Sequence, residues 1–374
     1  MKIKILLTVL LLTQVGCTTT RISKHNALNT KFQSCLDNEL TETMPGILVN
    51  ITSPGKNIFW SGASGLSDRE SREKLLPNQT FRIASVTKTF VAATVLRLWE
   101  DKRLSLEDPI SKYISQEHIG LLKAGGYDPD KITIRHLLTH SSGMAEHVNS
   151  PKFKVDFMKT HHVWTRTETI QDLNIYSKPV GPVGQQFSYS DTGYVLLGEM
   201  IETITGKSMG EAIVDELQLR KLGIKNTYME DFNGDFTGKR IHQYFENADT
   251  YRFHPSMDYY GGGGLLSTTE DLSRFFLSLF QHKVFRYKST LDRMLTSVEY
   301  KTPQSMDYRM GIWKIEINGM EAYTHSGFWG TQVVYIPSIN TAVSANYSQR
   351  WTKKGVAPVI PNLLGIIENN RIES

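Results

Sequence analysis

Stretches typical of β-strands lie near both ends of the chain, and stretches with the period of α-helices lie between them. Near the N-terminus, GILVNITS and KNIFWSGASG flank Pro54-Gly55, which predicts a hairpin. Near the C-terminus, four strand-like stretches precede a last helix near residues 356–369; they are YRMGIWKIEI, EAYTHSG, TQVVYIPS and TAVSANYS. Strands are therefore predicted from both ends of the sequence.

The middle of the chain is predicted to be mainly helical. FRIASVTKTFVAATVLRLWE begins an apolar helix that ends around DKRLSLEDP. Residues 132–222 are predicted to be mostly helical. A helix over ITIRHLLTHSSG is expected to end at Gly143, and in two later stretches apolar residues recur every 3.6 residues before a glycine ends the helix. EDLSRFFLSLFQ is a further amphipathic helix.

This order of elements predicts the fold class. Strands at both ends with helices between them favour an α/β (α+β) fold, with a sheet built from both chain termini and flanked by helices. An all-helical lobe at about residues 100–265 is inserted into the α/β part. The cleft where the two parts meet is the expected position of a site.

The N-terminus has the pattern of an export signal. Residues 1–17 combine two lysines, a short apolar run and small residues, and residues 18–40 read as a polar tether and the start of a first helix. Gly16-Cys17 resembles a bacterial lipoprotein cleavage site, which would anchor an acylated Cys17 in the membrane. Ordinary cleavage nearby is the alternative, and it leaves Cys17 and Cys35 free to pair. Either reading predicts an exported protein of the periplasm or cell envelope, with residues 41–374 as its main domain, the part that contains the candidate catalytic motifs described below.

Composition excludes some classes of partner. The formal net charge of +4 over 374 residues is small, and no basic stripe with interleaved aromatics is present, so nucleic acid is not an expected partner. Two cysteines do not make a disulfide framework. A small molecule or a peptide, such as a fragment of peptidoglycan, remains the expected partner, and the sequence leaves the oligomeric state open.

Three further patterns have a structural interpretation. His136 and His140 have the spacing of a zinc helix but lack the glutamate that follows the first histidine in metalloproteases, so no metal and no cofactor are predicted. Residues 261–264 are glycines without a P-loop lysine, which favours a close backbone turn beside the cleft. Tyr259 and Tyr260 before them either line the cleft or pack in the core.

Ser85 and Lys88 are the first candidates for chemistry. Residues at i and i+3 share a helix face, and the apolar residues 90–96 would disfavour the charged form of the lysine, so that it becomes a base for the serine. A serine at a helix start also gains free N–H groups that favour a developing anion. The alternative is an N-cap serine with a solvated lysine, because the same spacing recurs elsewhere in the chain.

Two later stretches complete an ordered set of motifs. SVTK (residues 85–88), YSD (residues 189–191) and HSG (residues 325–327) together resemble the serine β-lactamase and penicillin-recognising DD-peptidase superfamily. The pattern is most similar to the branch with class C β-lactamases, Tyr-x-Asn DD-carboxypeptidases and related esterases. HLLTHSSG and YGGGGLLSTTEDLSRF also resemble stretches of that branch, and the likeness runs from about Pro45 to the C-terminus.

The resemblance implies an acyl-enzyme mechanism. Ser85 would attack an amide or ester carbonyl while Lys88 and Tyr189 take its proton, and Tyr189 would then protonate the leaving group. A tyrosine needs cationic neighbours to act as a base at neutral pH, and Lys88 and a protonated His325 would supply them.

The same resemblance places the groups that bind the substrate. The oxyanion would lie between the backbone N–H groups of Ser85 and Phe328, and Gly327 would let its strand approach the substrate closely. Ser326 would hold a substrate carboxylate.

Asp191 departs from the asparagine of the family pattern. An ionised aspartate only accepts hydrogen bonds and favours the ammonium form of Lys88, so either Asp191 is protonated or Tyr189 carries more of the base function. A carboxylate here would also select substrates with a nearby amine and reduce activity on β-lactams relative to esters or peptides. The predicted activity is D-alanyl carboxypeptidase or β-lactamase-like. The alternatives are a small-ester hydrolase and a non-catalytic envelope binding protein.

Overall fold

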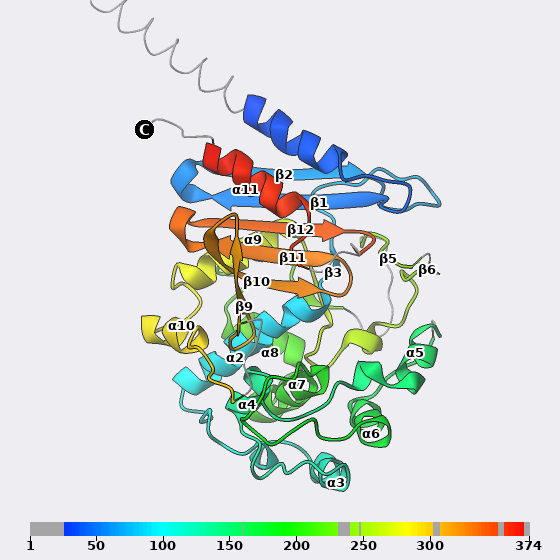
Figure 1. The fold of residues 1–374 in the computed structure, drawn as a ribbon, viewed down its shortest axis with the longest axis vertical. Coiled ribbons are helices and arrows are strands. Elements are labelled where there is room, and N and C mark those ends of the chain that lie inside the picture. The colour runs from blue at the N-terminus through cyan, green and yellow to red at the C-terminus, as the bar shows by residue number, and fades with distance from the viewer. Residues whose placement is uncertain are drawn as a thin grey trace, which may run out of the picture.

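The main sheet is assembled from both ends of the chain. A computed structural model describes residues 26–159, 161–230, 240–246, 248–301, 307–350 and 355–369. In this part of the chain, seven strands follow the order β2-β1-β12-β11-β10-β9-β8, and all neighbours are antiparallel (Figure 1). The strands are β1 (Gly46–Ser53), β2 (Ile58–Gly65), β8 (Asp307–Tyr308), β9 (Trp313–Ile317), β10 (Met320–Gly327), β11 (Thr331–Ile336) and β12 (Thr341–Tyr347). Because β1 pairs with β12, the predicted sheet from both termini is confirmed.

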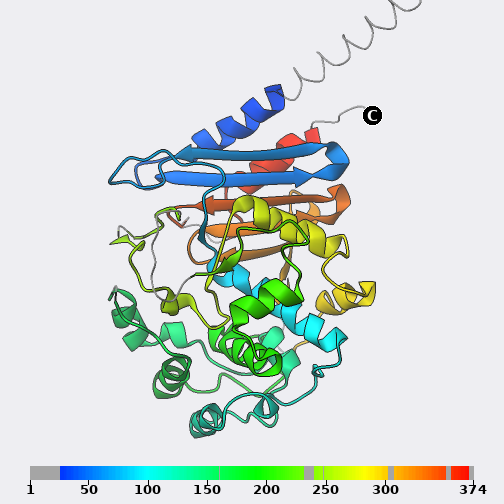
Figure 2. The ribbon, with the colours of Figure 1, turned by 180° about the vertical axis from the view of Figure 1, so that it is seen from behind.

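Helices cover both faces of this sheet. The helix over residues 26–37 and α11 (Val359–Asn369) bury their apolar sides in one cluster with β1, β11 and β12. On the opposite face, α9 (Thr269–Phe280) contacts β1, β11 and β12. The two views show α11 in front of the sheet in Figure 1 and α9 in front of it in Figure 2. The sheet is thus the middle layer of a three-layer sandwich.

The remaining helices form the second part of the molecule, below the sheet in Figure 1. They are α3 (Gln116–Ala124), α4 (Ile134–Leu138), α5 (Pro151–Phe157), α6 (Arg166–Tyr176), α7 (Asp191–Thr205) and α8 (Met209–Glu216). A short helix, α10 (Lys288–Met294), lies between α9 and β8 in sequence. Among the described helices, none has both the length and the apolar character needed to cross a membrane.

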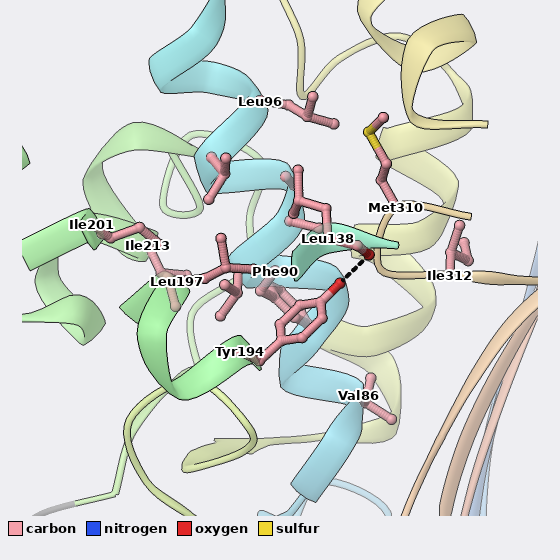
Figure 3. Close-up of a cluster of buried hydrophobic side chains, with 14 of the residues drawn as sticks. Val86, Phe90, Leu96, Leu138, Tyr194, Leu197, Ile201, Ile213, Met310 and Ile312 are labelled. Atoms are coloured by element: carbon pink, nitrogen blue, oxygen red, sulfur yellow. Dashed lines mark hydrogen bonds between the residues drawn. The ribbon is translucent and has the colours of Figure 1, made fainter. Parts of the chain in front are cut away.

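The helix α2 (Thr87–Glu100) joins the two parts and is buried on every side from Thr87 to Leu98. It packs against α7, α8 and α10, and Figure 3 shows apolar side chains from α2, α7 and α8 meeting around it. Tyr194 of α7 donates a hydrogen bond of 2.9 Å from its hydroxyl to the carbonyl of Leu138. A helix without a solvent face forces any polar side chain on it to find partners inside the protein.

Two elements differ from their predicted form. The helix expected to close on Gly143 ends at Leu138, because His140 adopts a left-handed φ of 53° and turns the chain. The strand expected over residues 308–317 is split into β8 and β9 by a turn at Gly311, whose φ is 76°.

Short strands also form outside the main sheet. One small sheet contains β3 (Phe81–Arg82), β7 (Leu265–Ser267) and β4 (Tyr228–Met229), and another contains β5 (Tyr244–Phe245) and β6 (Ala248–Asp249). Strand β3 leads directly into the turn that carries Ser85.

Residues 1–25 lie outside the described part of the chain. The predicted signal peptide, the lipid anchor at Cys17 and the alternative pairing of Cys17 with Cys35 therefore stay predictions. Cys35 itself is half-buried on the helix over residues 26–37 and packs beside the apolar cluster of that face.

Candidate active site

Ser85 lies in a single 3₁₀ turn, Ala84–Val86, between β3 and the start of α2. Ala84 has a φ of 45°, a conformation that costs free energy for a residue with a Cβ. The surrounding core holds it there, since Ala84 is fully buried. The turn leaves Ser85 partly exposed on a cavity while the helix that follows it is buried, as the sequence predicted for a serine at a helix start.

Lys88 reaches Ser85 from inside the protein. Its side chain is fully buried, and its Nζ donates hydrogen bonds of 3.0 Å to Ser85 Oγ and 2.6 Å to the carbonyl of Gly262. The same nitrogen forms an ion pair with Asp191, at the first position of α7. Three oxygen atoms from separate parts of the chain therefore surround one nitrogen.

The charge state of Lys88 differs from the prediction. Burial lowers the pKa of the ammonium, but the negative charge of Asp191 and the interaction with Tyr189 raise that pKa above its usual value. Lys88 is thus an ammonium in the resting site, and dry surroundings alone do not deprotonate it. As predicted from the sequence, Asp191 favours the ammonium form of Lys88.

Tyr189 completes what we call the catalytic corner, the group formed by Ser85, Lys88, Tyr189 and Asp191. Its side chain forms hydrogen bonds with Lys88 and Ser85, and Lys88 Nζ lies 5.0 Å from the centre of its ring. Burial raises the pKa of Tyr189 to about 12, although Lys88 acts in the opposite direction. The phenol is therefore protonated at rest and suited to donate a proton.

His325 does not carry the positive charge expected of it. The ring is 1% exposed in β10, and burial together with the charge of Lys88 lowers its pKa to about 3. Its Nδ1 lies 3.0 Å from the carbonyl of Ser326 and its Nε2 lies 3.4 Å from the hydroxyl of Tyr308. A neutral His325 packs behind the site through Tyr308, whose ring meets that of Tyr189 edge to face at 6.2 Å.

Gly327 brings the end of β10 against the Ser85 turn. A Cβ built on Gly327 would lie 2.1 Å from the carbonyl oxygen of Ile83, so no larger residue fits there. The next residue, Phe328, lines the same cavity as Ser85. Phe328 therefore follows directly on a residue that touches the backbone just before the nucleophile turn, and its part in an oxyanion hole stays a prediction. Ser326 is half-buried, and the described lining residues of the cavity include Phe328 but not Ser326.

Ser85 opens onto a cavity of about 670 Å³. We call the residues facing the catalytic corner the cavity wall. Its aromatic members are Phe153, Phe157, Phe245, Tyr259, Tyr260, Phe328 and Trp329. The wall also contains the acidic residues Glu246 and Asp258, while Asp191 lines the cavity from the corner. Tyr259 and Tyr260 thus line the cleft, one of the two positions that the sequence allowed.

The glycines at 261–264 form the close turn that the sequence predicted beside the cleft. Gly262 supplies the carbonyl that accepts from Lys88, and a Cβ on it would lie 3.4 Å from the Cβ of Asp191. A Cβ on Gly263 would lie 2.4 Å from Oδ1 of Asp258. Consecutive glycines therefore let the backbone run directly against two carboxylates.

Sequence reasoning missed two residues that hold the YSD segment in place. Glu146 Oε2 accepts a hydrogen bond of 2.8 Å from the backbone N–H of Asp191, and burial, with the charge of Asp191, raises the pKa of Glu146 well above its usual value. His140 Nδ1 accepts from the N–H of Ser190 at 3.1 Å, and its ring lies 4.2 Å from that of Tyr189. HLLTHSSG contains His140, but nothing in the sequence shows that the segment folds beneath Tyr189.

Comparison with protein families gives a match over most of the chain. The family model described as Beta-lactamase matches residues 32–357. Protein flp of Staphylococcus aureus (strain MW2) is 30% identical over 190 residues, which are 51% of this chain and 36% of that protein. Penicillin-binding protein 4* of Bacillus subtilis (strain 168) is 24% identical over 302 residues, 75% of this chain and 62% of that protein. The chain thus spans less than two thirds of either relative.

A solved structure shares the fold over nearly the whole chain. D-amino acid amidase from Ochrobactrum anthropi SV3, complexed with L-phenylalanine amide, superposes with a TM-score of 0.76. The sequences are 22% identical, and the match covers 92% of this chain and 99% of the amidase.

Proposed function

Because the chain belongs to the Beta-lactamase family, as its three motifs predicted, we propose that it is a serine hydrolase that forms an acyl-enzyme on Ser85. The observation that carries the proposal is the contact of 3.0 Å between Lys88 Nζ and Ser85 Oγ at the floor of an open cavity. Of the other lysines in the described residues that follow a serine by three positions, Lys74 is exposed and Lys56 is half-buried.

The first step is acylation. Ser85 Oγ attacks the carbonyl carbon, and its proton moves to Lys88. Since Lys88 is an ammonium at rest, it must first lose a proton to solvent before it can act as the base. The charge of Asp191 opposes that loss, so Lys88 accepts the serine proton only in molecules in which it is neutral.

The second half of the reaction uses Tyr189 and the backbone. The negative oxygen of the tetrahedral intermediate lies between the N–H groups of Ser85 and Phe328. The bond from the carbonyl carbon to the leaving nitrogen or oxygen then breaks, and that atom takes the proton of the Tyr189 hydroxyl. Lys88 returns a proton to Tyr189, and water then hydrolyses the acyl group to release a carboxylic acid and free Ser85.

The proposed substrates are amides, peptides or esters of the cell envelope. D-alanyl carboxypeptidase and β-lactamase-like activities remain the leading candidates, and a small-ester hydrolase is the alternative within the same chemistry. The name of the structurally similar D-amino acid amidase supports an amide carbonyl among these. Asp191, in place of the asparagine of the family pattern, favours amides, peptides and esters over β-lactams.

One observation supports a different function. Lys88 is held as an ammonium, so proton abstraction from Ser85 is opposed in the resting site. A non-catalytic member of the family that binds peptidoglycan fragments would tolerate this state. Export to the periplasm, with or without a lipid on Cys17, is part of both proposals.

A fluorophosphonate label distinguishes these functions. Wild-type protein is expected to be labelled on Ser85, and Ser85→Ala is expected to lose the label. Hydrolysis is then measured on nitrocefin, a D-Ala-D-Ala peptide, phenylalanine amide and p-nitrophenyl esters. A burst followed by turnover on any of them supports the hydrolase, whereas absence of labelling and of turnover on all of them contradicts it.

A further inference from the structure

The cavity beside Ser85 has charges of one sign. Among the described residues that line it, the charged side chains are those of Asp191, Glu246 and Asp258, and all three are acidic. His147 also lines the cavity, but burial lowers its pKa to about 4, so it is neutral at pH 7. Since Lys88 is already paired with Asp191, the cavity presents uncompensated negative charge to a ligand.

Asp258 is held by no direct ion pair with any described residue, although the charges of Lys88 and Arg82 act on it from a distance. It accepts a hydrogen bond of 3.2 Å from the indole N–H of Trp329. The buried carboxylate of Glu230, by contrast, pairs with both Arg82 and Arg240. The backbone at Gly263 closes against one side of Asp258, and the half-buried carboxylate lines the cavity on the other. A partly desolvated carboxylate without an ion-pair partner gains free energy when a cation binds.

The surroundings of Asp258 are aromatic. Trp329, its hydrogen-bond partner, contacts Phe328 edge to face at 4.9 Å, and Phe328 contacts Phe245 at 5.2 Å and Phe157 at 5.9 Å. Phe157 and Trp329 are buried, Phe245 and Phe328 are partly buried against them, and all four rings line the cavity. Such a surface favours a bulky apolar group, and aromatic faces also tolerate a neighbouring cation.

We propose that the substrates of this site carry a protonated amine together with a bulky apolar group. The ammonium pairs with the carboxylate of Asp258, and the apolar group packs on the rings of Phe157, Phe245 and Phe328. Amides and esters of aromatic amino acids with an unblocked amino group have this chemistry. The inference rests on the proposed acyl-enzyme function and names its substrate class.

The same cation would also affect the chemistry at Ser85. Asp191 and Asp258 lie against consecutive glycines, and each acts on the other electrostatically. An ammonium bound at Asp258 therefore weakens the hold of Asp191 on the proton of Lys88. Binding of the correct substrate would favour the neutral amine that Ser85 needs, so the amine is expected to raise kcat as well as lower KM.

The first test compares matched substrates on the wild-type protein. Phenylalanine p-nitroanilide, in both enantiomers, is compared with its N-acetyl derivative, which has the same ring and scissile bond but no charge. We expect kcat/KM for one enantiomer of the free amine to exceed that of its N-acetyl derivative by about 10- to 100-fold, the range for hydrogen bonds to charged groups. Equal rates, or a preference for the acetylated substrate, would overturn the proposal.

The second test compares two acidic residues of the same cavity wall. Asp258→Asn keeps the shape and the acceptor for Trp329, and it is expected to reduce the ratio of kcat/KM between the free amine and its N-acetyl derivative toward one. Glu246→Gln removes one negative charge from the same wall and is expected to cause a smaller loss. If Glu246→Gln reproduces the full loss, the assignment to Asp258 is wrong. A wild-type circular dichroism spectrum and melting temperature show that the Asp258→Asn protein is folded.

A binding measurement separates this inference from the proposed function. Calorimetry on Ser85→Ala compares phenethylamine with 2-phenylethanol, which has a similar shape and no charge. Tighter binding of the amine supports the cation site even if the wild-type protein hydrolyses nothing, a result that would defeat only the hydrolase. Hydrolysis without any preference for the amine, in substrate or ligand, defeats only the cation site.

Discussion

The catalytic corner and the cavity wall face each other, but they balance their charges differently. In the corner, the one cation, Lys88, contacts Ser85, Asp191 and a backbone carbonyl, so every charge has a partner within the protein. In the wall, Asp258 has an indole N–H and no ion-pair partner among the described residues. The corner is thus arranged to move protons, whereas in the wall the negative charge of Asp258 remains for a cationic ligand to pair with.

The largest expected effect is the loss of the cation from the corner. Lys88→Met fills the same buried space but removes the proton relay, and it is expected to slow acylation by about 10²–10⁴-fold. The burst phase with a p-nitrophenyl ester measures this rate. Lys112→Met is the matched control, because Lys112 is exposed and its contacts with Asp108 and Tyr113 lie at the surface, away from Ser85. If both variants acylate at the wild-type rate, the corner has no role as a base.

Gly327→Ala tests whether the end of β10 must touch the Ser85 turn. The added methyl would lie 2.1 Å from the carbonyl of Ile83, so the turn and the N–H of Phe328 must move apart. Loss of an oxyanion donor is expected to lower kcat by about 10²–10³-fold. Gly120→Ala, in α3 with open space around its added methyl, is the control. Normal kcat in Gly327→Ala would exclude the oxyanion hole from this position.

Asp191→Asn tests the ion pair that keeps Lys88 charged. Asp191 raises the pKa of Lys88, and the reactive amine forms only as pH rises through that pKa. Without the carboxylate the pKa falls, so the rising limb of the acylation rate should move to lower pH by about 1–3 units. Activity on nitrocefin relative to phenylalanine amide should rise. An unchanged pH profile and unchanged rates on every substrate would show that Asp191 does not control Lys88.

The smallest effect is expected at His325. Because its ring is already neutral, His325→Gln removes no charge from the corner, and the pH dependence of acylation should keep its shape. Loss of packing behind Tyr308 should lower the free energy of unfolding by about 0.5–3 kcal/mol, measured by urea denaturation. Disappearance of a titration step near pH 6–7 in the variant would mean that His325 is charged in the working enzyme.

The sequence identified the groups that lie close together along the chain better than those brought together by folding. The i, i+3 spacing placed Lys88 on Ser85, and the flanking strands predicted the sheet. His140, Glu146 and Asp258 were missed, since their roles depend on contacts with residues at least 40 positions away. The predicted charge states of Lys88 and His325 were wrong for a related reason. The apolar neighbours in the sequence indicated that both side chains are buried. The pKa of each group also depends on how burial combines with a nearby charge, and only the folded structure shows that.

The enclosure of α2 from Thr87 to Leu98 has a consequence for heat inactivation. A helix packed on all sides does not fray separately from the rest of the molecule, because its amides exchange only when the whole core opens. The nucleophile is attached to the first turn of that helix. Loss of Ser85 reactivity on warming should therefore coincide with the global melting transition, with no earlier phase in which the protein is folded but inactive.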